Sequence, residues 1–281
     1  MTTFAIAGIQ MAARAGDNLG AMSDLLELTV KRFPWVDMVM FGELCAYGPR
    51  PELAQSMPGP ALQHLCSLAR RFEIWLLPGS LYELDGDAVY NTAPVIDRTG
   101  EVVARHRKLY PFLPYEQGIT GGSEHTVFEV PDVGRFGVSI CYDMWFPETT
   151  RALACAGAEV VLHPSYTNTI DRDLELSIAR TNAGINQCYF VDINNAGDFG
   201  YGRSTIIGPE GDVLHQAGTD QEIIPVVVDL ERVRRSRREG LLGLGQVLKS
   251  FRDTEIDYPQ YASNGRSSSE LRALGPMLFR R

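Results

Sequence analysis

The sequence predicts an α/β fold in which two mixed β-sheets carry helices on their outer faces. Short apolar runs of strand length alternate with segments of helical periodicity. These segments begin in the order strand, helix, strand, helix, strand, pass through hairpins, return to strand, helix, strand and end in hairpins. Hairpins argue against a purely parallel, doubly wound sheet. Of the 281 residues, 44% are hydrophobic, which is enough for the core of one domain.

The N-terminal part predicts three strands separated by two helices. The apolar run at 4–11 is typical of a buried strand, and Asp17 or Asn18 can cap the helix that continues through Leu28. Pro60 suits the first turn of the second helix. For the rest of this part we expect strands at 35–43 and 74–82 and a helix at 58–72.

The remaining segments predict two hairpins around a strand–helix–strand unit. Turn residues at 98–100 and at 209–211 each separate two apolar runs, which indicates hairpins at 91–108 and 202–218. We further expect strands at 125–130, 134–141, 158–165, 188–197 and 222–230, a helix beginning near Pro147 and a helix at 171–187. Residues 1–250 are predicted to form one domain, and the polar tail at 251–281 to be loosely ordered or braced by another subunit.

Composition excludes several classes of function. A net charge of −9 argues against an electrostatic nucleic-acid binder, and the basic run at 232–238 is interpreted as a solvated helix face or a subunit contact. The five cysteines lack disulfide-framework or CxxC spacing, which favours a reducing compartment and argues against a structural zinc site. The N-terminal segment has no basic region and its apolar run is too short to cross a membrane. We therefore expect a cytoplasmic protein without a membrane or nucleic-acid partner.

Cys141 stands at the end of an apolar strand, where an α/β scaffold places reactive groups. A cysteine nucleophile needs a base, yet none of the five histidines stands in a cysteine-protease context. The carboxylate of Glu43 and the ammonium of Lys108 also follow apolar runs. Together they would supply a base and a cation. The spacing alone leaves open a core cysteine beside two solvated terminal charges.

Five segments of the sequence together resemble the nitrilase superfamily of carbon–nitrogen hydrolases. They contain Glu43 in FGELCAYG, Lys108 in HRKLYPF and Cys141 in GVSICYDMWFPE, followed by ARTNAGINQCYFVDINNAG and GRSTIIGPEGDVL. The resemblance implies an αββα sandwich, paired across a dimer interface into αββααββα. It also implies that Glu43 is the general base, Lys108 the cationic stabiliser and Cys141 the nucleophile. Glu116, eight residues after Lys108, is similar to a second glutamate that holds the substrate amide in the aliphatic amidase branch.

The roles implied by the resemblance require neither a metal nor an organic cofactor. Glu43 would take the thiol proton and return it to the leaving ammonia, and Lys108 would face the developing oxyanion. The backbone N–H of Tyr142 would be a second donor to that oxygen. The predicted function is therefore hydrolysis of a small aliphatic or carbamoyl-type amide through a cysteine thioester. Nitrile hydrolysis and a catalytically silent interaction subunit are the alternatives.

The substrate pocket is predicted to be aromatic. In the ω-amidase branch the resemblance implies an arginine four residues after the nucleophile, but here that residue is Trp145. Tyr142, Trp145, Tyr115 and Tyr47 are expected to line the pocket, and His163 either lines it or is a satisfied strand-end histidine. The WFPE segment resembles the N-carbamoylputrescine amidase branch. We therefore expect neutral short amides or cationic amides to be preferred over ω-amides of dicarboxylic acids.

Overall fold

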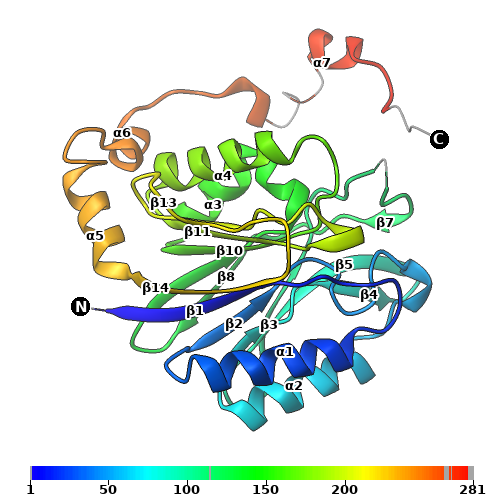
Figure 1. Cartoon of the computed structure of the whole chain (residues 1–281). Coiled ribbons are helices and arrows are strands. Elements are labelled where there is room, and N and C mark those ends of the chain that lie inside the picture. Colours follow the sequence, from blue (N-terminus) through cyan, green and yellow to red (C-terminus); the bar gives the residue numbers. More distant parts are fainter. Residues whose placement is uncertain (1, 114, 263–265, 267, 278–281) are drawn as a thin grey trace.

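The computed structural model describes residues 2–113, 115–262, 266 and 268–277. Two β-sheets lie face to face at its centre, and helices cover the outer face of each (Figure 1). This arrangement confirms the predicted pair of mixed sheets with helices outside them. Among the described residues, every helix is too short or too polar to span a lipid bilayer.

The first sheet is built mainly from the N-terminal part of the chain. Its strands follow the order β14–β1–β2–β3–β5–β4, and β6 and β7 also pair with β5. The strands β1, β2 and β3 are parallel, whereas β14 returns from the end of the domain and pairs antiparallel with β1. Their bounds are β1 (Thr3–Gln10), β2 (Met38–Phe41), β3 (Trp75–Leu77), β4 (Leu81–Asp85), β5 (Ala88–Ile96), β6 (Val102–Arg107), β7 (Ile119–Thr120) and β14 (Glu222–Asp229).

The second sheet has the order β13–β12–β11–β10–β9–β8. Its centre, β9–β10–β11, is parallel, and its two edges are antiparallel hairpins. The bounds are β8 (Thr126–Val130), β9 (Gly134–Val138), β10 (Val160–Ser165), β11 (Tyr189–Asn194), β12 (Thr205–Ile207) and β13 (Val213–Gln216).

Helices pack on the outer face of each sheet, so both faces of each sheet are buried. Figure 1 shows α1 and α2 against the first sheet and α3 and α4 against the second. The α-helices are α1 (Leu19–Arg32), α2 (Pro60–Phe72), α3 (Pro147–Cys155), α4 (Arg172–Asn186), α5 (Leu230–Glu239), α6 (Val247–Asp253) and α7 (Ser269–Ala273). Single 3-10 turns lie at η1 (Pro51–Leu53), η2 (Cys141–Trp145), η3 (Gly197–Phe199) and η4 (Pro259–Tyr261).

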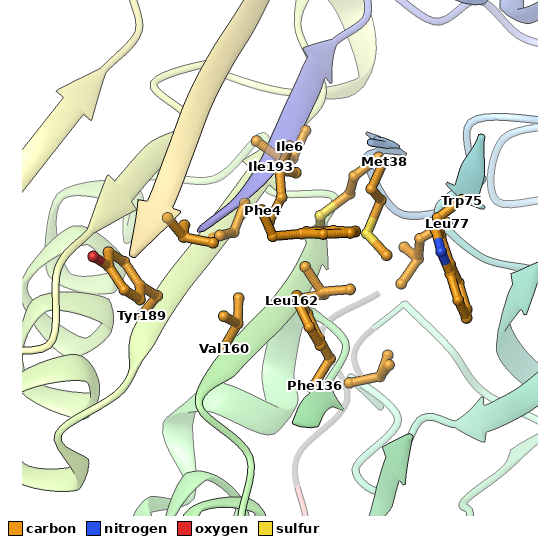
Figure 2. Packing of buried hydrophobic residues seen from close by; sticks show 14 of the residues in the cluster. Phe4, Ile6, Met38, Trp75, Leu77, Phe136, Val160, Leu162, Tyr189 and Ile193 are labelled. Carbon is orange, nitrogen blue, oxygen red and sulfur yellow. The ribbon is translucent and has the colours of Figure 1, made fainter. Parts of the chain in front are cut away.

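Strand β1 contributes side chains to two hydrophobic cores, one on each face of the first sheet. Successive side chains of a strand point to opposite faces of the sheet. Phe4 and Ile6 therefore enter the core between the sheets, while Ala7 and Ile9 enter the core beneath α1 and α2. Figure 2 shows Phe4 and Ile6 close to Ile193, which comes from the facing sheet.

Two expectations are corrected by the structure. The predicted strand at 74–82 is two strands, β3 and β4, because Gly79 has a φ of +77° that breaks the extended backbone. The basic run in α5 is only in part a solvated face: Arg235 and Arg238 are exposed, whereas other arginines of the run pair with acids of the same chain. Its Arg234 pairs with Glu159 at 2.7 Å, and its Arg232 pairs with Asp212 at 2.6 Å. These contacts fasten α5 to the body of its own chain.

Candidate active site

Three strand ends converge on one cavity of about 310 Å³. Glu43 follows β2, Lys108 follows β6 and Cys141 follows β9, and all three line this cavity. Glu43 and Lys108 are each only 2% exposed, and Cys141 is 7% exposed. The structure thus brings together the three residues that the sequence places 65 and 33 positions apart.

Lys108 lies between two carboxylates. Its Nζ donates to Glu43 Oε1 and to Glu116 Oε2, each at 2.7 Å. Asn91 of β5 donates from Nδ2 to both glutamates at 2.8 Å, so it holds the two carboxylates in register. The backbone N–H of Phe112 donates to Glu116 Oε2 at 2.7 Å. Every one of these side chains is buried, which makes the charged hydrogen bonds strong and their geometry well defined.

Cys141 occupies a sharp turn between β9 and η2. Its φ of 45° lies in the left-handed region, which is unfavourable for a residue with a Cβ. The turn points Sγ toward the segment after β10, with Tyr166 O at 4.0 Å and Thr167 Oγ1 at 3.9 Å. Such a conformation exposes the sulfur to the cavity while the backbone stays packed.

Asp143 connects this turn to the loop that carries Lys108. Its Oδ2 accepts from the backbone N–H of Ile140 at 2.9 Å. Its Oδ1 accepts from the backbone N–H groups of Leu109 and Tyr110 at 3.0 and 2.9 Å. His106 Nε2 lies 3.2 Å from Oδ2. One buried carboxylate therefore fixes the relative position of the lysine and the cysteine.

Burial and mutual charge set the protonation of the cluster. Burial, supported by the charge of Glu116 and opposed by Lys108, raises the pKa of Glu43 to about 7. Burial and the charge of Glu43 raise the pKa of the Cys141 thiol well above its usual value, although Lys108 acts against them. Burial alone would lower the pKa of Lys108, but Glu43, Cys141 and Glu116 together raise it well above its usual value.

At neutral pH the cavity thus combines a neutral thiol, a lysine cation and a carboxyl group that titrates near 7. A carboxyl with that pKa can accept a proton in one step and donate it in the next. The lysine cation faces the same space and can stabilise negative charge that develops on a reacting oxygen. This combination is suited to nucleophilic attack on a carbonyl carbon.

Not all of the expected pocket residues line the cavity. Tyr142, Trp145 and Tyr115 do so. Tyr47 lies outside the lining because its ring packs on the core beneath the first sheet and its hydroxyl accepts from Gln55 at 3.2 Å. His163 also lies outside it, since β10 points this side chain into the protein.

His163 is a buried structural histidine. Its Nδ1 lies 2.8 Å from Ser139 Oγ, and its ring packs 5.0 Å from that of Phe190. Burial lowers the pKa of His163 to about 4, so the imidazole is neutral at pH 7. The alternative of a strand-end histidine packed in the protein fits this environment, but the ring is only half satisfied, because Nε2 is buried without a hydrogen-bond partner among the described residues.

Several lining residues were not expected from the sequence. Glu175 comes from the start of α4, and Asp171 from the loop before it. Tyr82 comes from β4, and Phe112 from the loop between β6 and β7. Asn91 bridges the two glutamates from inside β5. The sequence signal that points to Asn91 is an asparagine within an otherwise apolar predicted strand, because a buried polar side chain needs hydrogen-bond partners.

Comparisons with known proteins agree with this geometry. Residues 3–238 match the family model described as carbon-nitrogen hydrolase. The chain is 31% identical to omega-amidase NIT2 of Homo sapiens over 211 residues, which cover 69% of this chain and 76% of that protein.

Two solved structures are similar along most of the chain. The crystal structure of Saccharomyces cerevisiae Nit3, a member of branch 10 of the nitrilase superfamily, has a TM-score of 0.78 at 28% identity and covers 84% of this chain and 94% of that one. An amidase from Nesterenkonia sp. has a TM-score of 0.74 at 25% identity and covers 84% and 94%. These matches confirm the predicted fold and the predicted hydrolase of carbon–nitrogen bonds. The chain belongs to the carbon–nitrogen hydrolase family, in the amidase-like part of the nitrilase superfamily.

Proposed function

We propose that this protein hydrolyses small linear amides through a thioester on Cys141 and releases ammonia. The observation that carries the proposal is the buried ammonium of Lys108, held at 2.7 Å by both Glu43 and Glu116 in the cavity that also exposes Cys141. A thiol, a base and a cation are the three groups that acyl transfer from an amide requires. The names of the relatives, omega-amidase and amidase, support the same reaction class.

In the first half-reaction Glu43 takes the proton of the Cys141 thiol while Sγ attacks the amide carbon. The carbonyl oxygen becomes negative and is stabilised by Lys108 and by the backbone N–H of Tyr142. When the carbon–nitrogen bond breaks, Glu43 returns the proton to the leaving nitrogen, which departs as ammonia. Because the pKa of the thiol is raised, proton removal and attack occur together and no stable thiolate precedes them.

In the second half-reaction Glu43 takes a proton from water, and the resulting hydroxide attacks the thioester carbon. The carbon–sulfur bond breaks, and Glu43 delivers its proton to the departing sulfur. The products are a carboxylic acid and the restored thiol. Glu116 contributes by orientation, because its carboxylate is tied to Lys108, Asn91 and the Phe112 backbone and faces the same cavity.

The test is a set of variants assayed for ammonia release. Glu43→Gln, Lys108→Ala and Cys141→Ala should each lower kcat/KM by ~10³-fold or more, because residues that act as a unit fail together. Glu116→Gln should lower it nearly as much. Cys155→Ala removes an exposed thiol and is the matched control, with activity retained. Mass spectrometry of wild-type protein with a small amide should show an acyl adduct on Cys141, and wild-type turnover by Lys108→Ala would contradict the roles proposed here.

The same protein and assays distinguish the proposed amidase from two alternative functions. A nitrile hydrolase would release ammonia from a nitrile faster than from the matching amide, so paired assays decide between them. A catalytically silent subunit would leave Cys141 without an adduct for every amide tested. The complete set of charged residues around Cys141 favours the amidase over the silent subunit. Tyr142 and Asp143 after the nucleophile, together with the amidase names of the relatives, favour it over the nitrile hydrolase.

The proposed substrates are neutral or cationic amides rather than ω-amides with a free carboxylate. Lys108 is the one cationic side chain that lines the cavity among the described residues, and it is already paired with two carboxylates. Arg172 and Arg203 are the other candidates for binding a substrate carboxylate, and neither lines the cavity. Arg172 is buried against Glu175 and Asp192, and Arg203 pairs with Asp173.

We also propose that the protein is a homodimer or a multiple of dimers. The outer face of α4 and the tail after residue 250 carry exposed apolar side chains, which include Leu174, Ile256 and Leu274. The tail lies over α3, where Tyr261 donates to Glu148 at 2.6 Å. The segment 180–187 is largely buried in its own chain, so α3, α4 and the described part of the tail after residue 250 form the proposed contact surface.

A cytoplasmic location is proposed from the cysteines. All five are free thiols, and Cys45, Cys141 and Cys188 are buried. A reducing compartment keeps such thiols unpaired and keeps the nucleophile active. Loss of activity on mild oxidation, restored by a thiol reductant, would support this placement.

A further inference from the structure

The cavity beside Cys141 has an excess of negative charge. Among the described residues, its lining contains the carboxyl groups of Glu43, Glu116, Asp171 and Glu175 against the single cation of Lys108. Lys108 hydrogen-bonds only the first two of these acids. Even with Glu43 protonated, the formal charge of the lining stays negative. An anionic substrate would therefore be repelled, and a cationic one would be attracted.

Two acids of the lining, Asp171 and Glu175, are not hydrogen-bonded to Lys108. Of these two, Glu175 is the buried one. It lies in the first turn of α4, and its side chain is only 4% exposed. Trp145 Nε1 donates to its Oε1 at 3.3 Å, and Arg172 Nη1 donates to its Oε2 at 3.1 Å. The side chain of Thr167 is a third hydrogen-bonding neighbour. An ionised carboxylate can accept about four hydrogen bonds, so acceptor capacity toward the cavity remains.

Arg172 does not neutralise this site by itself. Its Nη2 donates to Asp192 Oδ2 at 2.7 Å and to the carbonyl oxygen of Arg203 at 3.0 Å. One guanidinium is thus shared by two buried carboxylates, Glu175 and Asp192, and the group carries one excess negative charge. The positive end of the α4 dipole offsets part of that charge. A buried charge that is incompletely paired is costly, and a bound cation would remove the cost.

Aromatic side chains line the cavity around this carboxylate. The rings of Tyr142 and Trp145 are 6.1 Å apart, and that of Phe112 lies 4.9 Å from Tyr142. All three line the same cavity as Cys141 and Glu175. Their faces can pack against an alkyl chain and attract a cation. The aromatic side chains thus form an apolar wall of the cavity that contains both the Cys141 thiol and the Glu175 carboxylate.

From this arrangement we propose that Glu175 binds a protonated amine carried by the acyl chain of the substrate. The inference rests on the proposed amidase reaction at Cys141 and specifies its substrate as an amide with an ammonium group on its acyl chain. Trp145 holds the carboxylate in place and covers the alkyl chain between the ammonium and the reacting carbonyl. Glu175 is then a specificity residue that takes no part in bond making.

The experiment compares amides that differ only in their terminal group. 3-Aminopropanamide, 4-aminobutanamide and 5-aminopentanamide are each paired with the alkyl amide in which a methyl group replaces the ammonium. Glutaramate supplies a carboxylate end. In the wild type, the best-fitting amino amide should exceed its methyl analogue in kcat/KM by ~10-fold or more, as for a hydrogen bond between charged groups. Glutaramate should be the poorest substrate.

Glu175→Gln should reduce the ratio of kcat/KM for the amino amide over its methyl analogue by ~10-fold, because the amide side chain keeps the shape but not the charge. Asp173→Asn is the matched control: it removes a carboxylate from the same helix turn, but this side chain is 78% exposed and outside the cavity lining, so the ratio should stay unchanged. An unchanged ratio in Glu175→Gln overturns the proposal.

A second measurement needs no variant. n-Butylammonium should inhibit wild-type turnover of pentanamide competitively and ~10-fold more strongly than 1-butanol does, for the same electrostatic reason. Equal inhibition by the two compounds overturns the amine site even if Glu175→Gln fails to fold. Failure of the wild type to hydrolyse any of the amides would instead overturn the proposed function, so the two failures are distinguishable.

Discussion

In the proposed mechanism, Glu43 sets the pH range in which Cys141 can react. Its pKa is raised to about 7 by burial and by the neighbouring charge of Glu116, although Lys108 is in direct contact. A base must be ionised to accept the thiol proton, so the active form is lost as the pH falls through this pKa. The same value makes the protonated form a good acid toward the leaving nitrogen. Burial therefore suits one carboxyl group to both of the proposed roles.

This pKa predicts the acid limb of the activity profile. For a neutral amide, kcat/KM should be flat above pH ~8 and fall about tenfold per pH unit below ~6, with a midpoint near 7. The measurement is the initial rate of ammonia release at low substrate between pH 5 and 9. A midpoint near 4.5, the ordinary value for a glutamate, would mean that Glu43 is not the group that titrates.

Asp143 gives a second prediction for a single residue, because it is outside the lining of this cavity and still connects the two halves of the site. Asp143→Asn replaces one acceptor oxygen by a donor and should loosen the loop after Lys108. We expect kcat to fall ~10- to 100-fold with a smaller change in KM, as misplacement of catalytic groups does. Asp85→Asn, at an exposed position of β4, is the control. A change in KM alone would contradict a positioning role.

The break between β3 and β4 positions the segment that carries Glu43. Gly79 has a φ of +77°, and a Cβ added to it would lie 1.7 Å from the carbonyl oxygen of Gly42, the residue before Glu43. No side chain fits there without displacing that backbone. The two sheet elements therefore approach each other so closely at this point that only glycine is tolerated.

Gly79→Ala should thus both destabilise the protein and impair catalysis. Gly86→Ala is the matched control, because Gly86 also has a positive φ, +59°, but nothing lies within 4 Å of its added Cβ. The control should lose only the ~1 kcal/mol of a strained backbone, and Gly79→Ala at least ~2 kcal/mol more. Urea unfolding measures the two free energies. Equal losses would show that the contact with Gly42 relaxes freely.

Exposed apolar side chains lie on α4 and along the tail after residue 250. They include Leu174 on α4 and Ile256 and Leu274 in the tail. Exposed apolar surface of this kind is typical of an interface. The overall charge of −9 acts against self-association at low ionic strength, so burial of that surface must outweigh repulsion.

Light scattering at micromolar concentration should therefore give a mass of twice the 31.1 kDa of one chain, or an even multiple of it. Replacing Leu174 by glutamate should lower that mass, since it puts a charge into the contact surface. Val213→Glu, at an exposed position of the edge strand β13, is the control and should keep the wild-type mass. A wild-type mass of 31.1 kDa would contradict the dimer.

The sequence by itself determined the strand and helix order and the three residues at the strand ends. Periodicity and turn residues are local properties, so the hairpin turning at 98–100 and the helix from Pro60 follow from short windows of sequence. Glu43, Lys108 and Cys141 each end an apolar run, and in a sheet protein such ends lie at the surface where ligands bind. Their convergence required the resemblance to a family, because spacing along the chain does not specify which strands are neighbours.

Only the tertiary structure decided what surrounds those residues. Strand β14 joins β1 across more than 200 positions, Asn91 bridges Glu43 and Glu116 from inside β5, and Glu175 reaches the cavity from another helix. Tyr47, near Glu43 in sequence, turns instead into a different core. The raised pKa of Glu43 is likewise a property of burial rather than of any motif. Contacts between distant segments and exclusion of water exist only once the two sheets have packed, and these decide the protonation of the site and the selectivity proposed for it.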